Sequence, residues 1–366
     1  MTKDSIYFIA LSLLSHVNPF EKIKLLQLAG HAEFLFQKEF LETIPQLRQD
    51  IISELTNGAL LNKADEIMEV SYRHHIQICS IDGPLYSNKL RECPDAPLVL
   101  YYKGNISLND SKIVSIVGTR RATAYGRNLV SSMIQEFSEY DPSIQIVSGL
   151  AYGIDFLSHQ SAMKHNLRTI GVLGHGLQSI YPSMHQKSAD EMVEKGGAII
   201  TEYIWDTPAL PHQFIQRNRI IAGLCEVCII VESGIKGGSM RTAYMASGYN
   251  RDVFCFPGRV TDYYSKGCHA LIESDTAGLI QNGADVFKKM GWRHQPQKPV
   301  QSQLFAESSD LGKKLILEIS DNEIATAEIL AKSIKCSIQE TLAMLLDMEI
   351  NGIIGRNPGG SYYLLT

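Results

Sequence analysis

From Lys112 onward, the chain repeats a unit made of a short apolar run, a turn that contains glycine, and an amphipathic stretch. The apolar runs are rich in β-branched residues and predict strands at 113–117, 144–147, 169–173, 198–201, 227–231 and 253–256. Helical spacing between them predicts helices near 125–138, 154–165, 184–195, 212–223 and 238–249. Strands that are apolar throughout and alternate with helices are typical of an α/β fold with a mostly parallel sheet covered on both faces.

The ends of the chain show different patterns. Residues 1–75 have apolar positions at helical spacing, interrupted at Asn18-Pro19, Gly30 and Pro45, which predicts a small helical domain. Residues 76–290 form the central α/β domain, and residues 291–310 are rich in Gln and Pro and indicate a linker. Residues 311–366 are predicted to form three helices and a β-hairpin, the pattern of a winged-helix domain.

Composition and charge restrict the function. The 366 residues are 45% hydrophobic and carry a net charge of −5, which excludes a disordered chain and a uniformly basic surface. Only the block 111–270 is positive, with 15 Lys and Arg against 13 Asp and Glu. Any anion-binding site is therefore expected to be local and to lie in that block.

Cysteine usage and the N-terminus predict a cytoplasmic protein. The seven Cys are scattered and odd in number, which favours a reducing compartment over a disulfide framework. The pair Cys225 and Cys228 lies in an apolar run without a second ligand pair, so we expect core packing rather than zinc. The apolar run from Ile6 to Leu14 is too short to span a bilayer and lacks the flanks of a signal peptide.

Two glycine-containing turns follow the first two central strands. Ligands of parallel sheets bind beyond the carboxyl ends of the strands, so these turns are candidate phosphate-binding sites. A plain strand-to-helix turn with solvated arginines is the alternative for the first, and helix capping is the favoured role of Asp155 in the second. The candidate residues are Gly118, Thr119, Arg120 and Arg121 in the first turn and Ser148, Gly149 and Gly153 in the second.

Two further segments combine positive charge with a turn or a helix start. An aromatic ring beside two arginines suits a nucleic-acid strand, because the arginines can bind its phosphate while a base stacks on the ring. A salt-bridge cluster at a helix start is equally compatible with this segment. A glycine-rich loop with a lysine and hydroxyls after a buried strand also suits phosphate. The candidates are Phe214, Arg217, Asn218 and Arg219 in the first segment and Lys236, Gly238 and Ser239 in the second.

Several signatures of enzymes are missing. The first turn is not G-x-G-x-x-G, the loop at 234–239 is not a Walker A loop, and no nucleophile elbow or H-E-x-x-H motif occurs. We therefore expect binding without catalytic residues, metal or cofactor.

The ordered motifs VGTRRAT, SGLAYGID, QRNRIIAGL, SGIKGGS and GCHALI resemble those of the DNA-processing protein A family, DprA, also called Smf. The resemblance covers about 113–280 and implies an extended Rossmann-like domain, with a SAM or helix-hairpin-helix-like domain before it and a winged helix after it. It also implies a homodimer that binds and protects incoming single-stranded DNA in natural transformation and loads the RecA recombinase onto it. By position, Arg120 is the leading phosphate contact, and the residues implied for the dimer contact are His269, Leu271, Ile272 and Leu279.

The chain departs from the family pattern at three places. Tyr152 replaces the usual Arg of SGLARGID, which removes one positive charge, and Ile215 and Met184-His185 change loop shape. The third helix of the C-terminal domain, 337–350, carries Glu340, Asp347 and Glu349 and no Lys or Arg. A helix of that charge is repelled by phosphates, so we expect this domain to contact protein or to pack rather than to read DNA.

Two other functions remain open on sequence alone. The first is a nucleotide phosphoribohydrolase of a related Rossmann-like group, although no Glu follows Gly237–Thr242 at the start of the helix. The second is a nucleotide-binding sensor that uses the same loops. Affinity that rises with strand length and falls with salt would distinguish strand binding from both.

Overall fold

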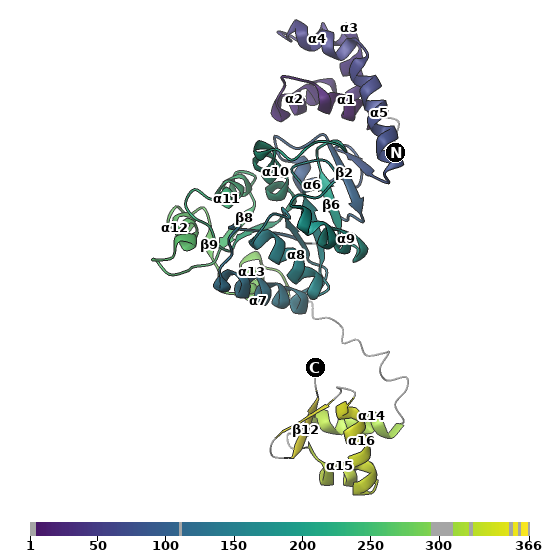
Figure 1. Cartoon of the computed structure of the whole chain (residues 1–366), viewed down its shortest axis with the longest axis vertical. Helices are drawn as coiled ribbons and strands as arrows, with labels where there is room; N and C mark the ends of the chain where they lie inside the picture. Colours follow the sequence, from purple (N-terminus) through teal and green to yellow (C-terminus); the bar gives the residue numbers. More distant parts are fainter. Residues whose placement is uncertain are drawn as a thin grey trace. The chain divides into compact units, whose positions relative to one another are not determined.

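The computed structural model describes residues 5–109, 112–293, 310–321, 325–350, 354–357 and 360–364. The chain divides into two compact units, residues 1–296 (unit 1) and 297–366 (unit 2) (Figure 1). Of the predicted linker 291–310, residues 294–309 lie outside the described residues.

A nine-stranded sheet organises unit 1. Its spatial order is β1-β2-β6-β5-β4-β3-β7-β8-β9, and the strands from β3 to β9 are parallel to one another. The bounds are β1 Gln77–Ser80, β2 Val99–Gly104, β3 Ile113–Val117, β4 Gln145–Ser148, β5 Arg168–Val172, β6 Ala198–Thr201, β7 Val227–Ile230, β8 Asp252–Cys255 and β9 Gly278–Leu279. The predicted mostly parallel, Rossmann-like sheet is confirmed.

Helices cover both faces of this sheet because its strands are apolar on both sides. On β3, Val114 and Ile116 pack against α7, α8 and α13, whereas Ile113 and Val117 belong to the core cluster that contains α10 and α11. The helices after β2 are α7 Ala124–Tyr140, α8 Ile154–Lys164, η2 Ser183–His185, α9 Gln186–Glu194, α10 Pro211–Leu224, α11 Gly238–Gly248, η3 Tyr263–Ser265, α12 Lys266–Glu273 and α13 Gly283–Met290. The predicted helices of the central repeat agree with these to within a few residues.

The sequence did not predict the two antiparallel strands at one edge. The predicted strands begin at residue 113, yet β1 and β2 precede them, and β2 joins β6 antiparallel. The short helix α6 Asn88–Arg91 lies between β1 and β2 in the sequence and is capped by the Ser87 hydroxyl, which accepts from the N–H of Leu90. The pairing of β2 with β6 joins segments far apart in the chain, which the local pattern does not reveal.

The N-terminal segment is helical, as its spacing predicts. Its elements are α1 Ser5–Leu13, α2 Pro19–Ala29, η1 Ala32–Phe36, α3 Lys38–Leu41, α4 Gln49–Thr56 and α5 Ala59–Arg73. A full capping box at Asn18 and Glu21 starts α2 where the Asn18-Pro19 break was noted. The buried side chains of these helices share one core cluster with the sheet, and His74 stacks on Trp205 with ring centroids 4.0 Å apart.

The described residues of unit 2 form three helices and a small antiparallel sheet. The elements are α14 Asp310–Asp321, β10 Ala325–Thr326, α15 Ala327–Ile334, α16 Ile338–Ile350, β11 Ile354–Arg356 and β12 Ser361–Leu364, with sheet order β10-β12-β11. Leu315, Leu330 and Leu345 are fully buried in its own core. Within the predicted β-hairpin, Ile353, Pro358 and Gly359 lie outside the described residues.

Candidate functional site

Five loops follow parallel strands and therefore emerge at one edge of the sheet. They are 118–123 after β3, 149–153 after β4, 173–185 after β5, 202–210 after β6 and 231–237 after β7, and we call this edge the loop face. The strand order reverses between β3 and β7, which is the position where open parallel sheets bind ligands. The convergence that the sequence implied is present.

The loop after β3 presents two arginines to solvent. Arg120 and Arg121 are both exposed, and within the described part of the chain neither guanidinium has a hydrogen bond or ion pair. The loop itself is fixed: the N–H of Thr119 donates to the carbonyl of Glu232 at 2.7 Å, and the carbonyl of Thr119 accepts from Ile154 at 3.1 Å. Two unpaired cations on a fixed backbone are available to an anion.

The glycines of this edge make room for the protein's own chain. A Cβ on Gly153, whose φ is +76°, would lie 2.7 Å from the Cα of Arg120, and one on Gly149 would lie 2.6 Å from the guanidinium carbon of Arg217. Gly118 faces the Ile154 side chain in the same way. The small size of these glycines is thus used to interlock the loops after β3 and β4.

Arg217 is buried under these loops rather than exposed on them. Its exposed fraction is 3%, and its guanidinium donates to the carbonyl of Gly149 at 2.6 Å and to the carbonyl of Val172. Its Nε donates to the side chain of the half-buried Asn218 at 3.2 Å. Burial lowers the pKa of Arg217 to about 10, and the carboxylate of Asp155 opposes that fall. The arginine stays charged at neutral pH and holds the ends of β4 and β5 together.

Arg219 and Ser148 are also committed to internal contacts. Arg219 is buried and forms an ion pair with the carboxylate of Glu202. The Ser148 hydroxyl donates to the carbonyl of Ile116 at 2.6 Å. Of the two readings of the Arg217-Asn218-Arg219 segment, the geometry favours the structural cluster.

The loop after β7 contributes one exposed cation. Lys236 is exposed and has no hydrogen bond or ion pair among the described residues, and a Cβ on Gly238 would meet nothing within 4 Å. The Ser239 hydroxyl is buried and donates to the hydroxyl of Ser233 at 2.8 Å. Lys236 and the open backbone at Gly238 face solvent, whereas Ser239 stabilises the turn.

Sequence reasoning missed Glu232, which occupies the point where the strand order reverses. This carboxylate is 4% exposed, accepts the N–H of Thr123 at 3.0 Å and accepts the hydroxyl of the same residue. Gly126 is required there, since a Cβ would meet the Glu232 carboxylate. An acidic residue directly after a buried strand was the available signal, but its partner Thr123 is 109 residues away.

Phe214 lies half-buried in the first turns of α10 and contacts the loop after β5. Its ring is tilted by 49° against that of Tyr181, with centroids 5.6 Å apart, and Gly174 lets that loop pass close to its backbone. The predicted aromatic residue therefore belongs to the loop face.

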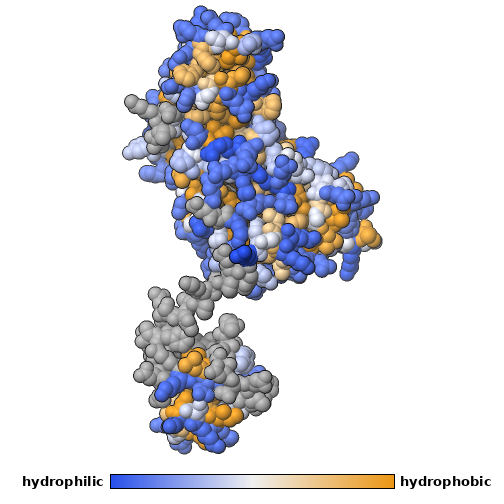
Figure 2. All heavy atoms as spheres, turned by 180° about the vertical axis from the view of Figure 1, so that it is seen from behind, coloured by the Kyte–Doolittle hydropathy of each residue, from blue (hydrophilic) through white to orange (hydrophobic). Residues whose placement is uncertain are grey.

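The residues implied for a dimer contact lie on α12 and on the edge strand β9; the N–H of Gly267 at the start of α12 donates to the carbonyl of Ser233 in the loop after β7 at 2.8 Å. Ile272 is half-buried, Leu279 is 39% exposed on the edge strand β9, and His269 is half-buried and bonded to the carbonyl of Gly258 at 3.0 Å. Leu271 is fully buried in the chain's own core and offers no surface to a second copy. Figure 2 shows hydrophobic residues gathered at the end of the unit where α12 and β9 lie.

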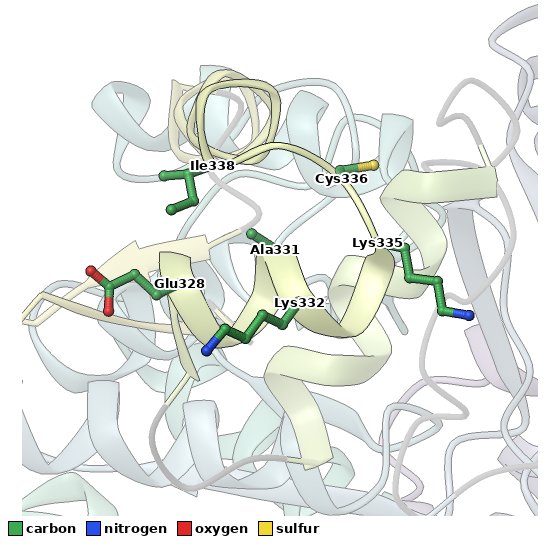
Figure 3. A pocket seen from close by; sticks show the side chains of 6 residues that line it. All are labelled: Glu328, Ala331, Lys332, Lys335, Cys336 and Ile338. Atoms are coloured by element: carbon green, nitrogen blue, oxygen red, sulfur yellow. The ribbon is translucent and has the colours of Figure 1, made fainter.

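Other features of the described residues do not form a competing site. No group of His, Cys, Asp and Glu in these residues is arranged to hold a metal ion. No described helix has both the length and the apolar character needed to cross a membrane. The hollow of unit 2 in Figure 3 is lined by Glu328, Ala331, Lys332, Lys335, Cys336 and Ile338, and its charged side chains point in different directions.

Known proteins resemble both the sequence and the fold. Residues 77–291 match the family model described as DNA recombination-mediator protein A. The chain is 30% identical to Protein Smf of Escherichia coli over 78% of this chain and 76% of that protein. It is 35% identical to DNA processing protein DprA of Bacillus subtilis over 69% of this chain and 86% of that protein.

Two solved structures share the architecture. DprA from Streptococcus pneumoniae superposes with a TM-score of 0.62 at 32% identity and covers 79% of this chain and 98% of its own. DNA processing protein A from Helicobacter pylori, whose structure is described as showing a single-stranded DNA binding mode, superposes with a TM-score of 0.53 at 29% identity. It covers 60% of this chain and 99% of its own.

Proposed function

The chain belongs to the DNA recombination-mediator protein A family, and from that premise we propose that it binds single-stranded DNA on the loop face of unit 1. The observation that carries the proposal is the pair of exposed, unpaired arginines Arg120 and Arg121 on a fixed loop beside the point where the strand order reverses. Arginine is suited to phosphate because its planar guanidinium donates two parallel hydrogen bonds. The proposed role is binding without turnover.

The proposal assigns different tasks to the predicted residues. Arg120 and Arg121 hold phosphates, Lys236 adds charge from the loop after β7, and the open backbone at Gly238 allows close approach. Phe214 offers its ring to a base. The remaining predicted residues act from beneath by fixing the loops; these are Gly118, Thr119, Ser148, Gly149, Gly153, Arg217, Asn218, Arg219 and Ser239.

Glu232 argues against the nucleotide hydrolase and the nucleotide sensor. Rossmann-like nucleotide sites place a phosphate at the N-terminus of the helix after the first parallel strand, here α7. The Glu232 carboxylate already accepts the N–H of Thr123 at this helix start. A phosphate in the same place would face a buried negative charge, so mononucleotide binding there is disfavoured.

The same proposal extends to the partners that family membership suggests. We propose that a homodimer forms through the surface that contains His269, Ile272 and Leu279. We also propose that the protein works in the cytoplasm, where it protects incoming single strands during natural transformation and loads RecA onto them. Sedimentation at several protein concentrations tests the dimer. A strand-exchange assay with RecA, with and without this protein, tests the loading.

Replacing Arg120 tests the binding site. Arg120→Ala should weaken binding of single strands of every sequence alike and should reduce the slope of log affinity against log salt by about 0.7, because one phosphate contact no longer releases a counterion. The measurement is fluorescence anisotropy with single-stranded and double-stranded oligonucleotides over a range of salt concentrations.

Arg168 provides the matched control. It is exposed at the amino end of β5, on the opposite edge of the sheet, and no partner for its side chain is found among the described residues. Arg168→Ala should leave both affinity and salt slope unchanged. Equal losses in both variants would point to overall charge rather than the loop face, and wild-type affinity in Arg120→Ala would reject the site.

A further inference from the structure

Two tyrosines expose large aromatic surfaces on the loop face, and one of them, Tyr181, lies against Phe214. Tyr181 is 55% exposed in the loop after β5, and Tyr152 is 44% exposed in the loop after β4. Within the described residues neither phenol oxygen has a hydrogen-bond partner. Exposed rings at the carboxyl edge of a sheet, where the folding core gains nothing from them, indicate surfaces that another molecule covers.

Buried histidines fix the backbone at Tyr181 and the ring of Tyr152. The backbone N–H of Tyr181 donates to Nε2 of His175 at 3.3 Å, and the Tyr181 ring lies against Phe214. Tyr152 meets His185 edge to face with centroids 5.3 Å apart, and the carbonyl of Leu150 accepts a hydrogen bond from Nδ1 of His185 at 2.9 Å. Rings that are already ordered lose little entropy when they bind a planar group.

The aromatic surface continues to the free arginines. Tyr152 directly precedes Gly153, whose Cα packs against the backbone of Arg120. The backbone of Arg120 thus lies beside the segment that carries Tyr152, whose ring meets His185, and a separate ring contact joins Tyr181 to Phe214. A nucleic-acid strand held at Arg120 therefore starts beside the segment that carries Tyr152.

We infer that Tyr152 and Tyr181 form, with Phe214, a stacking platform for the unpaired nucleobases of the bound strand. The inference rests on the proposed function, since it names how that site recognises its ligand. A base in a duplex has no free face to offer, so the platform selects single strands, whereas Arg120 holds phosphates of either form. At position 152, where the family pattern has Arg, this chain exchanges a phosphate contact for a base contact.

The experiment compares the full chain with its Tyr181→Leu and Tyr152→Leu variants, which remove the ring and retain an apolar side chain. The probes are an oligothymidylate of roughly 20 nucleotides and an abasic strand of the same length, with the same number of phosphates. Each Leu variant should bind the oligothymidylate about fivefold to a hundredfold more weakly, because one stacked base contributes roughly 1–3 kcal/mol. The salt slope and the affinity for the abasic strand should stay as in the wild type.

Three further variants complete the design. Tyr181→Phe and Tyr152→Phe keep the rings and should retain wild-type affinity. Tyr72→Leu, at a tyrosine of α5 that is 78% exposed, is the control for loss of an exposed ring. Tyr152→Arg restores the family residue and should steepen the salt slope by about 0.7 while lowering the preference for oligothymidylate over the abasic strand.

The outcomes separate this inference from the proposed function. If Arg120→Ala weakens binding while both Leu variants bind oligothymidylate like the wild type, the platform is rejected and the strand-binding site stands. Equal losses of affinity for the oligothymidylate and for the abasic strand also reject the platform, because the tyrosines then contact the sugar-phosphate backbone of the DNA rather than its bases. A wild-type protein that binds neither strand overturns both.

Discussion

At the scale of single residues, His159 shows how burial decides the state of a titratable group. Its ring is fully buried, and Nδ1 lies 2.7 Å from the hydroxyl of Thr169. The Thr169 hydroxyl donates its hydrogen to the carbonyl of Ile146, so Nδ1 of His159 must donate to the hydroxyl oxygen. Nε2 is then unprotonated and has no hydrogen-bond partner among the described residues. A second proton would sit on Nε2 with no acceptor, and burial lowers the pKa of His159 to about 3.

Stability should therefore fall as the pH falls. The pKa of His159 in the folded chain is about 3, below its ordinary 6.5, so between these values the unfolded chain binds a proton that the folded chain does not. The contribution is complete above pH 6.5 and is lost at about 1.4 kcal/mol per pH unit below it, or about 2 kcal/mol at pH 5. Burial lowers the pKa of His175 too, which acts in the same direction.

Urea unfolding between pH 7.5 and pH 5 measures this loss, with pH values chosen to bracket the ordinary titration of about 6.5. His159→Asn keeps a donor near Thr169 and does not titrate. Below pH 6.5, the slope of its free energy of unfolding against pH should therefore be smaller by the equivalent of about one proton taken up on unfolding. His212→Asn, at an exposed histidine of α10, is the matched control for the loss of an imidazole at the surface. An unchanged dependence in His159→Asn would show that this ring is protonated in the folded state.

At the scale of elements, the loops after β3 and β4 behave as one body because Gly153 lets them touch. Its backbone, with φ +76° and ψ −128°, is one that other residues rarely adopt, and a Cβ would run into Thr119 and Arg120. Gly153→Ala should lower the free energy of unfolding by about 2 kcal/mol or more, through strain and overpacking together, and should displace Arg120. Denaturant unfolding and anisotropy on one single strand measure the two effects.

Gly196 is the control for the backbone conformation alone. Its φ is +80°, and an added Cβ meets nothing within 4 Å. Gly196→Ala should cost about 1 kcal/mol and leave strand affinity as in the wild type. Were Gly153→Ala to cost no more than this and to bind normally, the interlock of the two loops would not position Arg120.

The elements that could be predicted from sequence are those with a strong local pattern. The buried strand 113–117 and the strand 198–201 have the predicted bounds, because runs that are apolar or β-branched apart from Ser115 favour strands covered on both faces. The strands β1, β2 and β9 are short edge or near-edge strands whose register is set by partners elsewhere in the chain. β1 and β9 have no strong local pattern, whereas the run Val99–Tyr102 of β2 is apolar and aromatic but was not predicted as a strand.

The same distinction applies to the site. That the loops share one edge follows from strand order, and the exposure of Arg120 follows from its place in a turn. The burial of Arg217 does not, because the carbonyls that it contacts belong to Gly149 and Val172, 68 and 45 residues away. Long-range partners of this kind decide which arginines of a motif remain free.

At the scale of the whole molecule, a chain of net charge −5 is able to hold a polyanion because its free cations are local. Arg219 is neutralised by Glu202 and Arg217 is bonded to carbonyls, whereas Arg120, Arg121 and Lys236 are exposed on the loop face. Within a Debye length of about 8 Å at physiological salt, a phosphate responds to these groups rather than to the net charge. Binding should therefore be strongly salt-dependent despite the acidic average.

Unit 2 contrasts with this surface. Its helix α16 exposes the apolar side chains of Ile338, Leu342 and Leu346 and contains acidic residues without Lys or Arg. A helix entering a groove of DNA needs cations toward the phosphates, whereas exposed apolar residues at helical spacing suit contact with protein. Unit 2 also has its own buried core, so unit 1 does not depend on it for folding.

Removing residues 297–366 should therefore change the affinity for single strands by less than about twofold, because every cation of the proposed site lies in unit 1. Anisotropy titrations of the shortened and full chains measure this, and circular dichroism checks that unit 1 remains folded. In the full chain, the double replacement Lys332→Glu and Lys335→Glu reverses the charges beside the hollow of unit 2. It should likewise change the affinity for single strands by less than about twofold. A tenfold or greater loss of affinity for single strands in either variant, roughly 1.4 kcal/mol, would show that unit 2 contacts the DNA strand, since contacts on unit 1 alone could not produce that loss.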